Sequence, residues 1–248
     1  MKRSPVAGVL FAATLALLLA ACGGGESKSD TATAESAAKD TATAPAPPAE
    51  VNTIITTPMN MMIVTHKVSD YGKWLTAYEA HDSMRQASGI HNYVIGRGVQ
   101  DSNTIMVAVK IDDLDKAKAF STSASLKQAM QKSGVKGAPS ISFATATWQD
   151  TAMISTAMRS RTTFSVKDWA AWLKSFEEGK QERIDNGLTV RVVGHDANDD
   201  KKVMLVTAIV DSAKAAAYWK SDALKKRREA GGVIGEPNRF LFNIVKRY

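Results

Sequence analysis

Apolar and β-branched runs alternate with amphipathic stretches along the chain, and this alternation predicts strands and helices in a fixed order. Residues that favour helix N-termini follow two of the runs, Ser69 or Asp70 after one and Asp112 or Asp113 after another. Gly89 suits the left-handed position that ends a helix. The pattern predicts a strand at Met61–Lys67, a helix ending before Gly89, strands at Ile90–Arg97 and Thr104–Ile111, a helix reaching about Ser133, and a strand at Ser140–Trp148.

A shift of 98 residues aligns this pattern with a second copy of itself. Between Val68 and Pro139, 23 of 72 positions are identical to the residue 98 positions later, without a gap. The clearest shared signature is Gly-Val-x-Gly-x-Pro, at 134–139 and again at 232–237. We therefore expect two tandem units, 59–150 and 151–248, the second ending with a strand at Arg239–Lys246.

Each unit has the order strand–helix–strand–strand–helix–strand, which is typical of an α+β, ferredoxin-like βαββαβ sheet with helices on one face. The opposite face of such a sheet is apolar and uncovered. Because the two units belong to one chain, we expect the two bare faces to cover each other within a single molecule.

Three stretches of the first unit resemble a known superfamily: Asp70-Tyr-x-x-Trp74, Glu79-Ala-His81-x-x-x-Arg85 and the Gly-Val-x-Gly-x-Pro signature. They resemble the dimeric α/β-barrel superfamily, which includes antibiotic-biosynthesis-monooxygenase-like domains. The resemblance covers residues 59–248 twice over and implies an intramolecular dimeric α/β barrel. It implies no single activity, because the superfamily holds monooxygenases, haem-degrading enzymes, dismutases and members of unassigned function.

The first 22 residues read as an export signal. Lys2 and Arg3 precede an uncharged apolar run, Val6–Ala21, which is shorter than the roughly 20 residues that span a bilayer. The run ends in Leu-Ala-Ala-Cys, which resembles the lipobox of bacterial lipoproteins, with Cys22 as the lipidated residue. The alternative is plain secretion with an incidental cysteine. In a Gram-negative host, Gly23 after the cysteine favours the periplasmic side of the outer membrane.

Residues 23–58 are rich in Ala, Thr, Ser and Pro, and this composition predicts a disordered, flexible linker. The chain as a whole is 44% hydrophobic and 23% charged, which excludes a wholly disordered or polytopic membrane protein. Its single cysteine excludes an intramolecular disulfide framework. Its charge of +7 lies mainly in residues 151–248, where 18 basic and 12 acidic residues give +6.

Candidate ligand-binding residues lie on the first helix of the first unit. At about 100° per residue, Trp74, Tyr78, His81 and Arg85 share one side of the helix. One interpretation is a cleft between this helix and the sheet, lined by aromatic rings, with His81 and Arg85 at its mouth. Such a cleft suits a small, flat or anionic ligand. The alternative is that the aromatic rings belong to the core and the polar end is solvated.

The second copy separates shared residues from unshared ones. It keeps the tryptophan and the arginine, but His81 corresponds to Gly179 and His66 to Phe164. His66 and His81 are therefore the candidates for acid–base catalysis, if they meet across the cleft. The four histidines lack ligand spacing, so no metal site is expected, and no cofactor is expected either.

A basic cluster, Lys225–Arg228, lies on the last predicted helix. It reads either as a surface for anionic lipid or envelope polymers, or as an ordinary solvated helix face. Nucleic acid is not an expected partner of an exported protein. The leading interpretation is an exported, lipid-anchored protein that binds a small apolar or aromatic ligand or serves a structural role. The alternatives are a monooxygenase-like oxidoreductase with one active cleft in the first unit, and a partner-binding module that uses the basic face.

Overall fold

Each predicted helix of a repeat is divided in two, and each predicted strand is present. The computed structural model describes residues 52–248, so the predicted signal peptide, Cys22 and the linker up to residue 51 lie outside the described residues. The first repeat consists of β2 (Met59–Val68), α1 (Tyr71–Ala80), α2 (Asp82–Gln86), β3 (Ile90–Gly98), β4 (Thr104–Ile111), α3 (Leu114–Ser121), α4 (Ala124–Lys132) and β5 (Val135–Asp150). Among the described helices, none has the length and apolar character needed to cross a membrane.

The second repeat has the same order of elements. It consists of β6 (Met158–Val166), α5 (Trp169–Glu178), α6 (Lys180–Asp185), β7 (Leu188–Asp196), β8 (Asp199–Ile209), α7 (Ser212–Trp219), α8 (Asp222–Ala230) and β9 (Val233–Arg247). A short strand, β1 (Ile54–Ile55), lies within the expected linker and pairs with the end of β5. The last residues of that segment therefore belong to the sheet.

Local sequence explains where the helices begin and end. The side chain of Asp70 accepts a hydrogen bond from the Lys73 amide and caps α1, and Asp113 caps α3 in the same way. Ser123 caps α4, so the predicted long second helix stops and restarts there. Gly89 has a φ of 65°, which confirms its predicted left-handed conformation.

The last strand of the first repeat begins earlier than predicted, and the glycine signature lies inside it. β5 starts at Val135, not Ser140, and pairs Lys136 with Lys67 and Ser140 with Thr65. Residues 137–139 therefore face only His66 and form a bulge, which Gly137 allows with its φ of 72°. β9 repeats this arrangement opposite Phe164.

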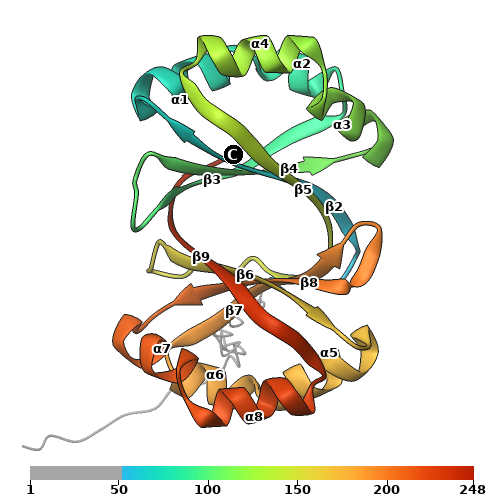
Figure 1. Ribbon diagram of the computed structural model, residues 1–248, viewed down its shortest axis with the longest axis vertical. Coiled ribbons are helices and arrows are strands. Elements are labelled where there is room, and N and C mark those ends of the chain that lie inside the picture. Colours follow the sequence, from blue (N-terminus) through green and yellow to red (C-terminus); the bar gives the residue numbers. More distant parts are fainter. Residues whose placement is uncertain (1–51) are drawn as a thin grey trace, which may run out of the picture. The chain divides into compact units, whose positions relative to one another are not determined.

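The strands form one antiparallel sheet in the order β1-β5-β2-β4-β3-β9-β6-β8-β7, and β5 also pairs with β7. The pairings thus run from β5 through β2, β4, β3, β9, β6, β8 and β7 and return to β5. The helices of the first repeat cover the outer face of β2–β5, and those of the second cover β6–β9 (Figure 1). The fold is a mixed α+β, ferredoxin-like fold with a large antiparallel sheet.

Alternate positions of each strand belong to different cores. Met62 and Val64 of β2 pack under the helices of the first repeat, with Trp74. Met61 and Ile63 belong to a cluster on the opposite face, which also contains Met204 and Phe242 of the second repeat and others of both repeats. The face of the sheet away from the helices is thus buried by side chains from both repeats.

Candidate functional site

All the site residues predicted for the first repeat line one cavity between its helices and its sheet. The cavity has a volume of about 70 Å³. Its lining includes His66, Trp74, Tyr78, His81 and Arg85, with apolar residues of β2, β4, α3 and α4. Strand β2 supplies His66 and helix α1 supplies the aromatic rings.

The aromatic rings form a continuous stack along α1. Trp74 is only 2% exposed, and its ring centroid lies 5.2 Å from Tyr78, 6.0 Å from Tyr71 and 5.4 Å from His66. Burial raises the pKa of the Tyr78 hydroxyl, so Tyr78 is neutral at physiological pH. Trp74 and Tyr78 of this stack form an aromatic wall of the cavity.

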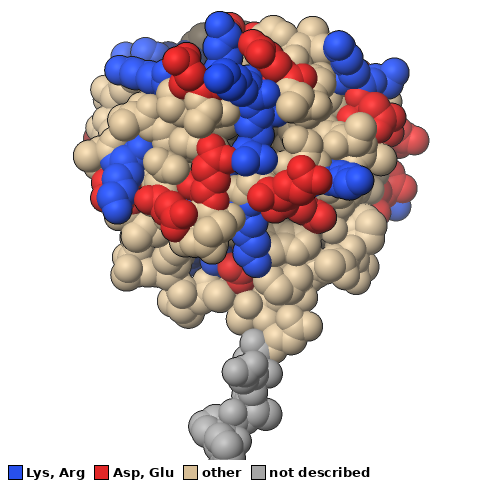
Figure 2. All heavy atoms as spheres, turned by 90° about the horizontal axis from the view of Figure 1, so that it is seen from below, with Lys and Arg blue, Asp and Glu red and all other residues tan. Residues whose placement is uncertain are grey.

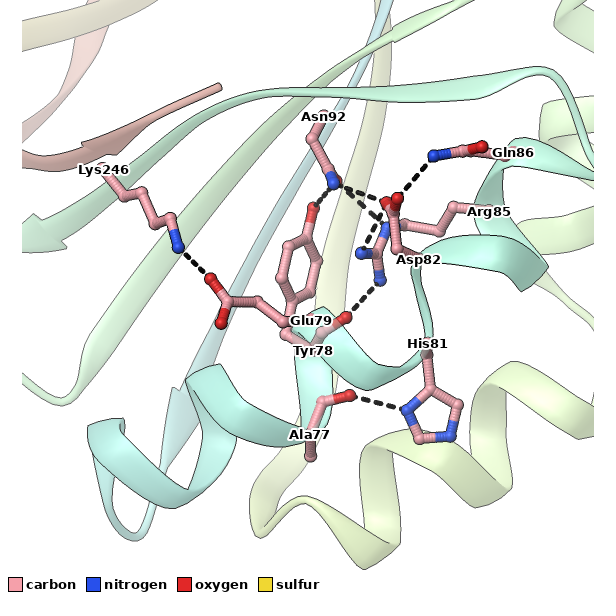
Figure 3. Close-up of polar contacts among 9 residues, drawn as sticks. All are labelled: Ala77, Tyr78, Glu79, His81, Asp82, Arg85, Gln86, Asn92 and Lys246. Carbon is pink, nitrogen blue, oxygen red and sulfur yellow. Dashed lines mark hydrogen bonds and ion pairs between the residues drawn. The ribbon is translucent and has the colours of Figure 1, made fainter.

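Arg85 does not lie at the mouth of the cleft, where the sequence analysis expected it. It is 6% exposed, and its guanidinium lies 3.7 Å from the centre of the Tyr78 ring. It donates to the Tyr78 carbonyl (2.7 Å), to Asn92 Oδ1 (3.1 Å) and to Asp82 Oδ1 (3.1 Å) (Figure 3). A charge in this position needs these partners, so Arg85 holds the junction of α1 and α2 together.

The second repeat supports this structural role. Arg183 lies 3.7 Å from the centre of the Phe176 ring and donates to the Phe176 carbonyl at 2.5 Å. The arginine–aromatic–carbonyl arrangement is thus common to both repeats, although no carboxylate accepts from Arg183 among the described residues. Burial lowers the pKa of Arg183 to about 10.

His66 has no such partners. It is 6% exposed, and both of its ring nitrogens are buried without a hydrogen bond among the described residues. Burial lowers its pKa to about 4, so the imidazole is neutral near pH 7 and carries one free donor and one free acceptor. It lies opposite the β5 bulge and faces the cavity.

His81 lies at the break between α1 and α2. Its Nδ1 donates to the Ala77 carbonyl at 2.6 Å. The ring points away from the Asp82–Arg85–Asn92 contacts (Figure 3). His66 and His81 line the same cavity, but no hydrogen bond joins them, so they do not form a catalytic pair in this structure. Within residues 52–248 there is also no cluster of side chains that could hold a metal ion.

The equivalent cavity of the second repeat is more polar. It has a volume of about 90 Å³, and its lining includes Arg183, Arg227, Arg228 and Arg239. Two members of the predicted basic cluster therefore turn toward this cavity, while Lys225 and Lys226 are exposed. Basic and acidic side chains are intermixed on this face (Figure 2), so the cluster does not form one broad basic surface.

A group of arginines on the face of the sheet away from the helices is absent from the predicted site residues. Arg159 and Arg161 line a third cavity there. The signal was present in the repeat, because the 98-residue shift aligns Arg159 with Met61 and Arg161 with Ile63. Two positions on one face of a strand are thus apolar in the first repeat and charged in the second.

No protein-family model matches the chain, and no curated protein is similar to it in sequence. Solved structures share its fold. An anthrone oxidase-like protein has 13% sequence identity and a TM-score of 0.50, over 79% of this chain and 95% of that one. A monooxygenase-like protein from Listeria innocua has 7% identity and a TM-score of 0.45, over 78% and 98%.

A third solved structure, a ferredoxin fold protein from Listeria monocytogenes related to antibiotic biosynthesis monooxygenases, has 8% identity and a TM-score of 0.44, over 77% of this chain and 97% of that one. At 13% identity, the likeness to the anthrone oxidase-like protein concerns the fold alone. The chain thus has a mixed α+β, ferredoxin-like fold with a large antiparallel sheet.

Proposed function

We propose that this chain is an exported, lipid-anchored protein that binds a small, mainly apolar molecule in the cavity of the first repeat. The observation that carries the proposal is His66, a buried imidazole with two unbonded nitrogens facing an aromatic cavity. An unpaired buried polar group costs about 1–3 kcal/mol. A ligand with one hydrogen-bonding group would recover that cost, and Trp74 and Tyr78 would contact its apolar part.

The volume of the cavity limits the size of the ligand. One water needs roughly 10–15 Å³ of such a volume, so about 70 Å³ holds a molecule of about five heavy atoms. Pyrazole and cyclopentane are matched probes, because both are five-membered rings and only pyrazole can donate to and accept from His66.

The test is an NMR titration of the protein with both probes, read at the His66 ring protons and the Trp74 indole. We expect pyrazole to bind the wild type at least tenfold more tightly than His66→Phe, which reproduces the residue of the second repeat. His91→Thr, the matched change at a half-exposed histidine, should bind as the wild type does. Equal pyrazole affinity in the wild type and His66→Phe would contradict the proposal.

Catalysis is the second candidate function. The unprotonated nitrogen of His66, in a largely apolar cavity, can accept a proton from a bound ligand, as a monooxygenase-like reaction would need. A pKa of about 4 makes it a weak base, so we place binding first. Oxygen uptake in the presence of ligands found by titration tests this candidate, and uptake that His66→Phe abolishes would favour it over simple binding.

We also propose that the two repeats form the intramolecular counterpart of a dimeric α/β barrel. Support comes from the pairings of β3 with β9 and of β5 with β7, which join the repeats at both edges, and from the apolar cluster that both repeats share. Because this arrangement covers both sheet faces, no second chain is required. Sedimentation equilibrium of the chain lacking residues 1–22 should give the mass of one chain, and an obligate dimer would contradict the proposal.

The proposal of a lipid anchor rests on the sequence of residues 1–22 alone. It would hold the folded body on the membrane surface, at the periplasmic side of the outer membrane if the host is Gram-negative. Metabolic labelling with palmitate in the native host tests it. Label should enter the wild type and not Cys22→Ser, and labelling of both would place the modification elsewhere.

A further inference from the structure

The sheet face away from the helices encloses the third cavity, separate from the helix-side cavity described above. Its volume is about 260 Å³. Apolar side chains of both repeats line most of its wall, among them Met61 and Ile63 of the first repeat and Met204 and Phe242 of the second. All the arginines in the lining come from the second repeat.

Positive charge in this cavity exceeds negative charge. Arg159, Arg161, Arg191 and Arg247 line it, and the only carboxylate in the described lining is Asp150. Asp150 pairs with Arg191 at 2.8 Å, and both side chains are nearly buried. Arg247 is exposed, but the buried Arg159 and the partly buried Arg161 have no carboxylate partner in the lining, although buried charges normally carry one.

Only some of the N–H donors of these arginines have a hydrogen-bond acceptor among the described residues. Arg159 is 2% exposed, and its Nη1 donates to the carbonyls of Thr156 and Met158. Arg161 donates from Nη2 to Ser142 Oγ at 3.2 Å, while its Nε is buried with no partner among the described residues. Burial, and then the charges of Arg247 and Arg191, lower the pKa of Arg159 to about 10, which means that these positive groups act on one another.

We propose that this cavity binds a small organic carboxylate, whose charge pairs with Arg161 and Arg159 and whose hydrocarbon part lies against Met61 and Ile63. A carboxylate matches the planar fork of a guanidinium and can accept two hydrogen bonds from it. The apolar wall opposite favours an anion with a hydrocarbon body over an inorganic one. The volume accommodates a carboxylate such as benzoate or hexanoate.

The repeat itself supplies variants that should fold. Arg161→Ile gives β6 the residue that β2 carries at the equivalent place, and Arg228→Met does the same for α8 relative to α4. Both changes remove one positive charge, but Arg228 lines the helix-side cavity of the second repeat. Arg228→Met is therefore the matched control for long-range charge effects.

The experiment is isothermal titration calorimetry of the whole protein at constant ionic strength with benzoate, hexanoate, benzyl alcohol and sulfate. We expect at least one carboxylate to bind the wild type and Arg228→Met equally, and to bind Arg161→Ile at least tenfold more weakly. Benzyl alcohol and sulfate should not displace the bound carboxylate. Without ligand, Arg161→Ile should melt at or above the wild-type temperature, because a buried charge has been replaced by an apolar side chain.

Three results would overturn the inference. The first is failure of both carboxylates to bind, and the second is unchanged carboxylate affinity in Arg161→Ile. The third is that sulfate displaces the bound carboxylate as strongly as the other carboxylate does. The helix-side cavity is probed separately by pyrazole and His66→Phe, so either proposal can fail without the other.

Discussion

Protonation of His66 should make the folded protein sensitive to mild acid. The pKa of this imidazole is about 4 in the folded chain and 6.5 in the reference state. Between these values the unfolded chain binds a proton that the folded chain does not bind. The stabilisation from a neutral His66 is therefore complete above about pH 6.5 and is lost as the pH falls toward 4.

The size of the effect follows from the shift. Linkage over these two pKa values gives a loss of about 2 kcal/mol in the free energy of unfolding between pH 7.5 and pH 5. His66→Phe cannot bind this proton, and it should pack well because Phe164 lies 5.4 Å from Trp172, as His66 lies from Trp74. The variant should therefore lose about 2 kcal/mol less than the wild type over the same range.

Urea denaturation at pH 7.5 and pH 5, followed by tryptophan fluorescence, measures this difference. His91→Thr is the control, because His91 pairs with Asp112 on the surface and such pairs contribute little. It should lose as much stability as the wild type. If His66→Phe and the wild type lose equal stability between the two pH values, His66 is not buried in its neutral form, and the reasoning about the cavity fails.

Two further substitutions test the scaffold. Arg85→Ala should destabilise the protein by about 2–4 kcal/mol, because it removes a buried guanidinium that bonds Asp82 and Asn92; chemical denaturation measures this. Gly194→Ala should cost about 2–4 kcal/mol, because its new Cβ would lie 2.3 Å from the Thr145 carbonyl oxygen at the β5–β7 seam. Gly72→Ala, in a helix with space, should stabilise by up to about 1 kcal/mol and serves as its control.

Strand and helix order could be predicted because it depends on local patterns that occur twice. Asp70, Asp113 and Gly89 act at their own positions, as capping and left-handed conformation require. The early start of β5 could not be predicted, since Gly137 indicates the end of a helix and Pro139 the beginning of a strand. Only the pairing with β2 shows that both lie in a bulge within β5. Local propensity gives way there to a long-range pairing.

The sequence predicted that certain side chains lie together, but it did not predict their contacts. A helical period places Trp74, Tyr78, His81 and Arg85 on one side, and the structure does bring them to one cavity. The period cannot show that Arg85 is enclosed by Asp82 and Asn92, because Asn92 reaches it from another element. Presence in both repeats was the better guide to its structural role.

A single chain can do with this sheet what two identical subunits cannot. In a symmetric dimer, every side chain on the shared face occurs twice, so the arginines at positions 159 and 161 would also replace the apolar residues at positions 61 and 63. The buried charge would then double, and the apolar surface that Met61 and Ile63 supply would disappear. Duplication within one chain lets one repeat keep Met61 and Ile63 while the other carries Arg159 and Arg161, which creates an apolar cavity whose arginines all come from one repeat. The asymmetry that an amphipathic anion requires is therefore available only because the halves evolve as separate segments of one chain.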